Sequence, residues 1–179
     1  MHTWPIKKTF FDDRASEIAE AALVLPLAFM VLLGIYWFGR AFNTYATINN
    51  AAREGARVAL AQTCGNCGNG APLTTNIANA VEQAMKASSV DPGQVRVYTP
   101  ALNFCSGGTR ALNCSSAGAS GNIGICTNVQ LDIPPVNGGA PTCGVSVAFQ
   151  YPYQFWLPFT SLNNQQIILT ADVQMAGEY

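Results

Sequence analysis

The chain has 179 residues and a formal net charge of −1, and only 11% of its residues are charged while 49% are hydrophobic. This length is sufficient for one membrane helix and one soluble domain with a buried core. The near-neutral charge argues against nucleic-acid binding, which requires a basic surface. Only eight of the 19 charged residues (9 Lys and Arg plus 10 Asp and Glu) follow residue 57, so the surface of that region suits packing against copies of itself or other partners.

The first distinct segment is a short polar leader, residues 1–15, and an uncharged apolar run follows it at residues 21–39. The run reads AALVLPLAFMVLLGIYWFG, which as a helix is long enough to cross a bilayer core of roughly 30 Å. It is longer than the core of a secretory signal, and no small-residue cleavage site follows it, so we expect an anchor that stays in the membrane. Three Lys or Arg residues lie on each side of the run, and this tie leaves its orientation open.

All six cysteines follow the apolar run: Cys64, Cys67, Cys105, Cys114, Cys126 and Cys143. An even number on one side of a membrane indicates an oxidising compartment and disulfides. We therefore expect a cytoplasmic N-terminus and an extracytoplasmic domain. The best single guess for the pairing joins near neighbours, as Cys64–Cys67, Cys105–Cys114 and Cys126–Cys143.

The Cys64-Gly-Asn-Cys67 stretch could also suggest a zinc or redox site. Zinc needs four ligands, and the only histidine, His2, lies before the apolar run. A redox C-x-x-C normally opens a helix, which lowers its thiol pKa, whereas this one follows a predicted helix. A structural disulfide fits better.

The helical pattern continues beyond the apolar run, and we expect one helix over residues 16–62. Apolar residues recur near 3.6-residue spacing at Phe42, Tyr45, Ile48, Ala52, Ala56, Ala59 and Leu60. About half of this helix would lie in the membrane, and the Gly- and Pro-containing CGNCGNGAP would end it. A second helix is predicted over 74–90, capped by Thr74, Thr75 or Asn76. Its apolar stripe is Ile77, Ala80, Val81, Ala84 and Met85.

The rest of residues 63–179 is strand-like. Apolar and polar residues alternate in four segments, namely 95–97, 129–133, 145–155 and 167–175. Strict period two predicts a sheet with one buried face. The Gly-, Ser- and Asn-rich stretch 101–127 is predicted to be a loop held by disulfides, with a hairpin as one option. The predicted fold is α+β: a long N-terminal helix, half transmembrane, packed on an antiparallel sheet of about four strands, which is the plan of a pilin.

Glu20 stands at the edge of the apolar run, where a charge is costly. Cleavage between Ala15 and Ser16 would make Ser16 the first residue and Glu20 the fifth. The Glu20 carboxylate could then neutralise the new amine of a neighbouring subunit inside the membrane. The alternative is that Glu17 and Glu20 are headgroup-facing charges on an uncut anchor.

The stretch EIAEAALVLPLAFMVLLGIYWFGRAFNTYATINNAAREGAR, within residues 16–57, resembles the TadE-like family, pilin-like proteins of the tight-adherence (Flp-type) pilus and secretion machinery. Two positions depart from the family's usual pattern, since Ala21 replaces an aromatic residue and Ala15 a glycine. The resemblance implies a single-pass protein of the bacterial inner membrane that can enter a surface pilus. It implies as partners other pilin-like subunits, including its own copies, a prepilin-type peptidase, a pilus assembly platform and membrane lipid. It implies neither nucleic acid nor a cofactor.

The AAREGAR stretch carries Arg53, Glu54 and Arg57 on the second half of the predicted helix. Glu54 and Arg57 are three residues apart and can pair. This face is either simply solvated or contacts lipid phosphates or a partner subunit.

No histidine follows the apolar run and the later acidic residues are scattered, so we expect neither a catalytic nor a metal site. The predicted function is a minor pilin, pseudopilin or filament subunit. The alternatives are an uncut single-pass assembly factor and a membrane-tethered binding module that uses the 101–127 loop.

Overall fold

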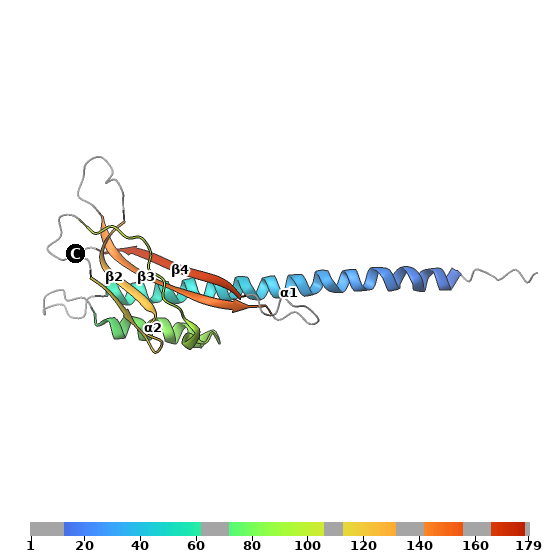
Figure 1. Ribbon diagram of the computed structural model, residues 1–179, viewed down its shortest axis with the longest axis horizontal. Coiled ribbons are helices and arrows are strands. Elements are labelled where there is room, and N and C mark those ends of the chain that lie inside the picture. Colours follow the sequence, from blue (N-terminus) through green and yellow to red (C-terminus); the bar gives the residue numbers. More distant parts are fainter. Residues whose placement is uncertain (1–12, 62–71, 106–112, 132–141, 156–165, 178–179) are drawn as a thin grey trace, which may run out of the picture. The chain divides into compact units, whose positions relative to one another are not determined.

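The computed structural model describes residues 13–61, 72–105, 113–131, 142–155 and 166–177, with the backbone alone at 13–16. The elements are α1 (Asp13–Leu60), α2 (Thr74–Ala87), a 3₁₀ turn η1 (Pro92–Gln94), and strands β1 (Asn113–Ala117), β2 (Ile123–Gln130), β3 (Cys143–Gln154) and β4 (Gln166–Ala176) (Figure 1). The chain divides into two compact units, residues 1–40 and 41–179, and α1 runs unbroken through the boundary.

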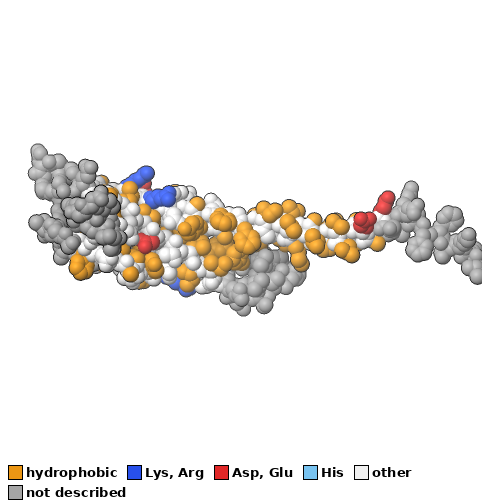
Figure 2. Space-filling view, turned by 90° about the horizontal axis from the view of Figure 1, so that it is seen from above, with side chains coloured by type: hydrophobic (Ala, Val, Ile, Leu, Met, Phe, Trp, Pro, Cys, Tyr) orange, Lys and Arg blue, Asp and Glu red, His pale blue; other side chains and the backbone are white. Residues whose placement is uncertain are grey.

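In the first unit most of the described side chains of α1 are exposed, while Leu33 and Trp37 are half-buried. Figure 2 shows hydrophobic side chains along this part of the helix and acidic side chains at its N-terminal end. Within the described residues, α1 is the one helix long and apolar enough to cross a membrane. Pro26 lies inside it, in a position where membrane helices tolerate proline.

In the second unit the rest of α1 forms part of the core. The buried residues are spaced three or four apart and so share one face: Ile48, Ala51, Ala52, Ala56 and Ala59. The predicted stripe was wrong at its start, because Phe42 is 72% and Tyr45 47% exposed. Periodicity identifies a face of a helix but not how far along that face the domain extends.

The second helix, α2, ends at Ala87, three residues before the predicted end. Ile77, Val81 and Met85 are buried as expected. The predicted side-chain cap is wrong: the N-cap is Leu73, which makes no side-chain hydrogen bond. Thr74, Thr75 and Asn76 already have helical backbone, whereas a capping residue stands just outside the helix.

The sheet has the strand order β1-β2-β3-β4, and all neighbours are antiparallel. The number of strands agrees with the prediction but their composition does not. Residues 95–97 contribute only an isolated bridge between Arg96 and Gln150, whereas the polar NCSSA segment forms β1. The predicted strand 129–133 overlaps only the end of β2. The α+β layout of a long apolar helix and a four-stranded antiparallel sheet has the pilin-like arrangement.

One face of the sheet contributes Val145, Val147, Phe149 and Tyr151 to the core shared with α1 and α2. The expectation of a single buried face is wrong for β3, where every residue from Gly144 to Phe149 is buried. The preceding chain explains the second buried face. Arg96 forms a β-bridge with Gln150 of β3, and Phe104 forms a β-bridge with Val129 of β2. The stretch between Arg96 and Phe104 therefore lies over the side of β2 and β3 that faces away from the helices.

Candidate assembly and membrane site

The exposed half of α1 combines large apolar side chains with two acids. Leu23, Leu25 and Leu27 are each at least 66% exposed, and Glu17 and Glu20 are exposed as well. No cation among the described side chains lies within ion-pair distance of Glu20. A helix of this composition requires a lipid or protein environment.

The predicted processing bond, between Ala15 and Ser16, lies within α1, which begins at Asp13. The leader before residue 13 and the side chains of both residues lie outside the described part of the chain. Cleavage at this bond stays a prediction.

Aromatic and basic residues meet where the apolar run ends. The rings of Tyr36 and Trp37 are edge-to-face with centroids 5.4 Å apart. The Arg40 guanidinium carbon lies 6.0 Å from the centroid of the Trp37 ring. Trp, Tyr and Arg are the side chains that anchor a helix at a membrane–water boundary.

The AAREGAR stretch has a buried side and an exposed side. Its small residues are buried: Ala51, Ala52, Gly55 and Ala56. Its charged residues are exposed, and a Glu54 carboxylate oxygen lies 3.6 Å from an Arg57 guanidinium nitrogen, as their spacing predicted. An exposed pair of this kind contributes about 0–1 kcal/mol. The buried small residues, of which Ala52 and Ala56 belong to the predicted apolar stripe, fix where α1 meets the domain.

Gly55 shows why this side must be small. A Cβ atom at Gly55 would overlap Cγ2 of Val81 on α2 and lie 3.6 Å from Cγ1 of Val147 on β3. The glycine thus sits at the point where the two helices and the sheet meet. Its spacing from Ala51, Ala52 and Ala56 was the sequence signal for this packing.

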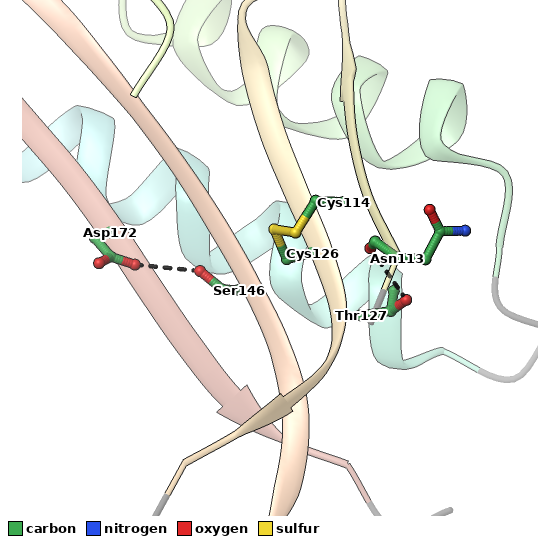
Figure 3. Close-up of a disulfide and its surroundings, with 6 residues drawn as sticks. All are labelled: Asn113, Cys114, Cys126, Thr127, Ser146 and Asp172. Atoms are coloured by element: carbon green, nitrogen blue, oxygen red, sulfur yellow. Dashed lines mark hydrogen bonds between the residues drawn. A yellow bond between two sulfur atoms is a disulfide. The ribbon is translucent and has the colours of Figure 1, made fainter. Parts of the chain in front are cut away.

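Two disulfides join the described cysteines, and both differ from the predicted pairing. They are Cys105–Cys143 and Cys114–Cys126, with Cα–Cα distances of 5.8 and 4.1 Å. Cys114 and Cys126 face each other across β1 and β2 (Figure 3). The Cys105 N–H donates to the Asn128 carbonyl of β2. This hydrogen bond holds Cys105 near Cys143 at the start of β3, and not near Cys114, its predicted partner. Proximity in the sequence could not reveal these pairings. The predicted Cys64–Cys67 disulfide falls on residues that lie outside the described part of the chain.

A pocket of about 240 Å³ lies on the face of the sheet opposite the helices. It is lined by Val97, Tyr98, Thr99, Pro100, Cys114, Ser115, Ser116, Gly124, Cys126, Ser146 and Ala148. The hydroxyl group of Ser146 donates to the Asp172 carboxylate over 3.3 Å (Figure 3). The lining is uncharged and its strand residues are small, a feature that period-two reasoning did not detect.

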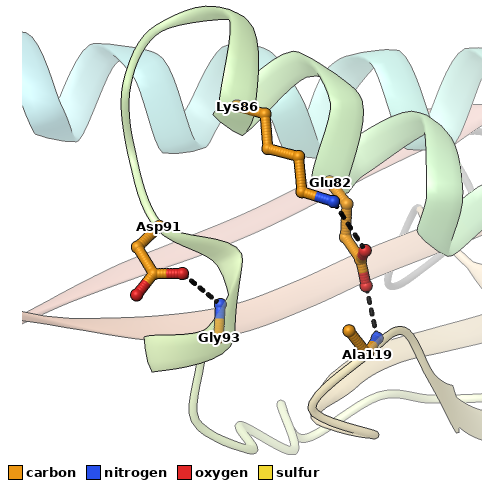
Figure 4. A network of polar contacts seen from close by, with 5 residues as sticks. All are labelled: Glu82, Lys86, Asp91, Gly93 and Ala119. Atoms are coloured by element: carbon orange, nitrogen blue, oxygen red, sulfur yellow. Dashed lines mark hydrogen bonds and ion pairs between the residues drawn. The ribbon is translucent and has the colours of Figure 1, made fainter.

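Glu82 connects α2 to the turn between β1 and β2 (Figure 4). It is 7% exposed, and its carboxylate accepts the backbone N–H of Ala119. The ammonium group of Lys86 lies 3.8 Å from the other carboxylate oxygen. This contact holds the hairpin against α2 and has no evident chemical role.

Within the described residues, no three His, Cys, Asp or Glu side chains are grouped so that they could hold a metal ion. Across the described part of the chain, one apolar helix long enough to span a membrane and an α+β domain give the layout of a pilin-like, single-pass membrane protein.

The family model described as "TadE-like protein" matches residues 16–57. The resemblance seen in the sequence is therefore confirmed over this segment. No curated protein and no solved structure matches the chain.

Proposed function

We propose that this chain is a minor pilin, pseudopilin or filament subunit of a tight-adherence pilus. It acts by assembly with other pilin-like subunits through the exposed half of α1. The leader is removed after Ala15 by a prepilin-type peptidase in the bacterial inner membrane. The C-terminal domain is outside the cytoplasm before an assembly platform takes the subunit up.

The observation that carries this proposal is the exposure of α1 around Glu20. The apolar side chains near it are uncovered, and no described cation pairs with the carboxylate. The hydrocarbon of lipid can surround the apolar side chains but cannot compensate a charge. The freed amine of Ser16 on a neighbouring subunit would compensate it, and only in an assembly.

The charged side of AAREGAR is a second candidate contact. Arg53 stands 13 positions after Arg40 on α1, which is about 20 Å along the helix at 1.5 Å per residue. The headgroup region adds only about 5–7 Å beyond the hydrocarbon core on each side. This length favours a partner subunit over lipid phosphates as the contact of Arg53 and Arg57.

N-terminal sequencing tests the processing step. Protein from the envelope and from sheared surface filaments should begin at Ser16. An Ala15→Leu variant should keep its leader because the peptidase requires a small residue, and Ala15→Gly serves as its processed control. A parent protein that begins at Met1 in both fractions would contradict the proposal and support an uncut assembly factor.

A reporter fused after Tyr179 tests the orientation. An enzyme that is active only outside the cytoplasm should be active in this fusion. Activity of a cytoplasm-dependent reporter instead would reverse the proposed orientation.

A membrane-tethered binding module is a second candidate, and the pocket on the outer face of the sheet favours it. Residues 114–116 and 124–126 lie in the predicted recognition stretch, and several of them line this pocket. Assembly of the Ser16–Tyr179 protein into filaments would decide for the first proposal.

A further inference from the structure

The two described disulfides differ in how accessible they are. Cys114 is exposed, whereas its partner Cys126 is 6% exposed. Cys114 lies in β1, a five-residue strand at the edge of the described sheet, next to β2. Cys105, by contrast, is 5% exposed, and its partner Cys143 is half-buried at the start of β3. Because thiol–disulfide exchange requires direct attack on a sulfur atom, access to that atom helps to set its rate.

A recess lies directly beside the accessible disulfide. Cys114 and Cys126 both line the pocket of about 240 Å³, which is smaller than a typical small-molecule site of roughly 300–1,000 Å³. Its size suits one or two side chains of a docked polypeptide. None of its lining residues is charged, and the nearby Asp172 carboxylate accepts a hydrogen bond from Ser146 of the lining.

We propose that Cys114–Cys126 is a thiol–disulfide exchange site for a dithiol protein of the C-x-x-C type, whose attacking segment enters this recess. The proposal does not depend on the assembly role. One thiolate of the dithiol attacks Sγ of Cys114, and Cys126 leaves as a thiolate. The second thiol then attacks the mixed disulfide and releases Cys114. The protein disulfide gains two electrons and two protons, and the dithiol becomes a disulfide.

The described core limits the consequence of this reaction to the sheet edge. Of the five β1 residues, only Ala117 belongs to the core cluster. Neither of two other contacts involves this disulfide: Glu82 accepts the Ala119 N–H, and Cys105–Cys143 joins the chain before β1 to β3. Reduction therefore loosens β1 and leaves the helix–sheet core intact.

Differential alkylation of the full chain in detergent micelles tests the order of opening. Dithiothreitol is added under native conditions, samples are trapped over time, and alkylated peptides are mapped. We expect Cys114 and Cys126 to be labelled about tenfold faster than Cys105 and Cys143. Equal rates, or faster opening of Cys105–Cys143, would overturn the proposal.

Filling the recess tests whether a protein dithiol docks there. Ser116→Trp and Val97→Trp both alter exposed residues that line the pocket, and Gln83→Trp on the exposed side of α2 is the control. With reduced thioredoxin as the probe, both recess variants should react about tenfold more slowly than the control. With dithiothreitol, their rates should differ from that of the control by less than about threefold.

Protection of Cys105–Cys143 in each variant reports that the fold is retained. A folded pair of recess variants that reacts with thioredoxin as fast as Gln83→Trp would exclude docking in the recess. If the rates with thioredoxin and with dithiothreitol fall by the same factor, the substitutions merely block access of any thiol to the disulfide. This result would also reject docking of a protein partner.

Discussion

The two halves of α1 both carry apolar side chains, but these side chains differ in size and in burial. Residues 21–39 are rich in Leu and also contain Val, Phe, Ile and Met, and these large side chains are mostly exposed. Residues 51–59 contain Ala51, Ala52, Gly55 and Ala56, which are buried. Large side chains maximise the apolar area presented to lipid or a partner, whereas small ones allow a helix to approach a sheet and a second helix closely.

This difference separates two functions of one helix. The small residues bind the helix to its own domain, while the large residues and Glu20 remain available for the membrane and for assembly. Apolarity alone does not distinguish these functions, because both halves carry it. Side-chain size along the helix does.

The sharpest test of the comparison changes one glycine in each half. Gly55→Leu should destabilise the domain by about 1–3 kcal/mol, because overpacked side chains strain a close-packed core. Gly39→Leu is the matched control, since a Cβ there meets no atom within 4 Å. The urea midpoint of the full chain in detergent, followed by near-UV circular dichroism, should fall only for Gly55→Leu. Equal midpoints would show that Gly55 does not limit the packing.

A comparable effect is expected at Glu82 of α2, which belongs to the same domain as the buried half of α1. Glu82→Ala removes the acceptor of the Ala119 N–H and should cost about 1–3 kcal/mol. Glu82→Gln keeps an acceptor oxygen and should retain most of that stability. Lys86→Ala loses only the ion pair of a 62% exposed side chain, a change of at most about 1 kcal/mol. The same urea unfolding assay measures all three variants. If Lys86→Ala loses as much stability as Glu82→Ala, the hydrogen bond to Ala119 is not the main contribution of Glu82.

The smallest effect concerns the pH dependence of the domain. Burial raises the pKa of the Tyr151 phenol above its ordinary value of 10.0, and the charge of Asp91 raises this pKa further. The unfolded chain therefore loses this proton first, and stability that is complete below pH 10 declines as the pH rises toward the folded pKa. Tyr151→Phe should reduce the loss of stability between pH 9 and about 11, and Asp91→Asn should reduce it less. The free energy of unfolding is measured by urea titration at each pH. If it falls with pH as steeply in both variants as in the parent, the assignment is refuted.

Local chemistry made much of the fold predictable. The apolar periodicity located both helices, and the alternation through residues 145–155 located β3, since each pattern reflects one repeating backbone geometry. The residues Phe149 and Tyr151 pack in the core, as their period-two spacing indicated.

The missed features depend on contacts between distant segments. The polar NCSSA segment becomes β1 because it pairs with β2 in a hairpin and is joined to it by Cys114–Cys126, and strand propensity does not report such pairing. The position of Cys105 follows from its hydrogen bond to Asn128. The pocket likewise exists because residues 97–100 lie over Gly124 and Ala148. None of these contacts has a local sequence pattern.

The most direct test of the central claim is a comparison of Glu20→Ala with Glu17→Ala in cells. Removing one partner of a buried ion pair costs about 3–5 kcal/mol, which lowers an association constant by roughly 100-fold or more. The Glu20→Ala protein should be made, inserted and oxidised normally, yet be absent from sheared filaments and from crosslinked complexes with pilin-like subunits. Glu17→Ala should assemble nearly like the parent. If Glu20→Ala assembles as well as Glu17→Ala, then the carboxylate only faces the headgroups, and α1 is an anchor rather than an assembly element.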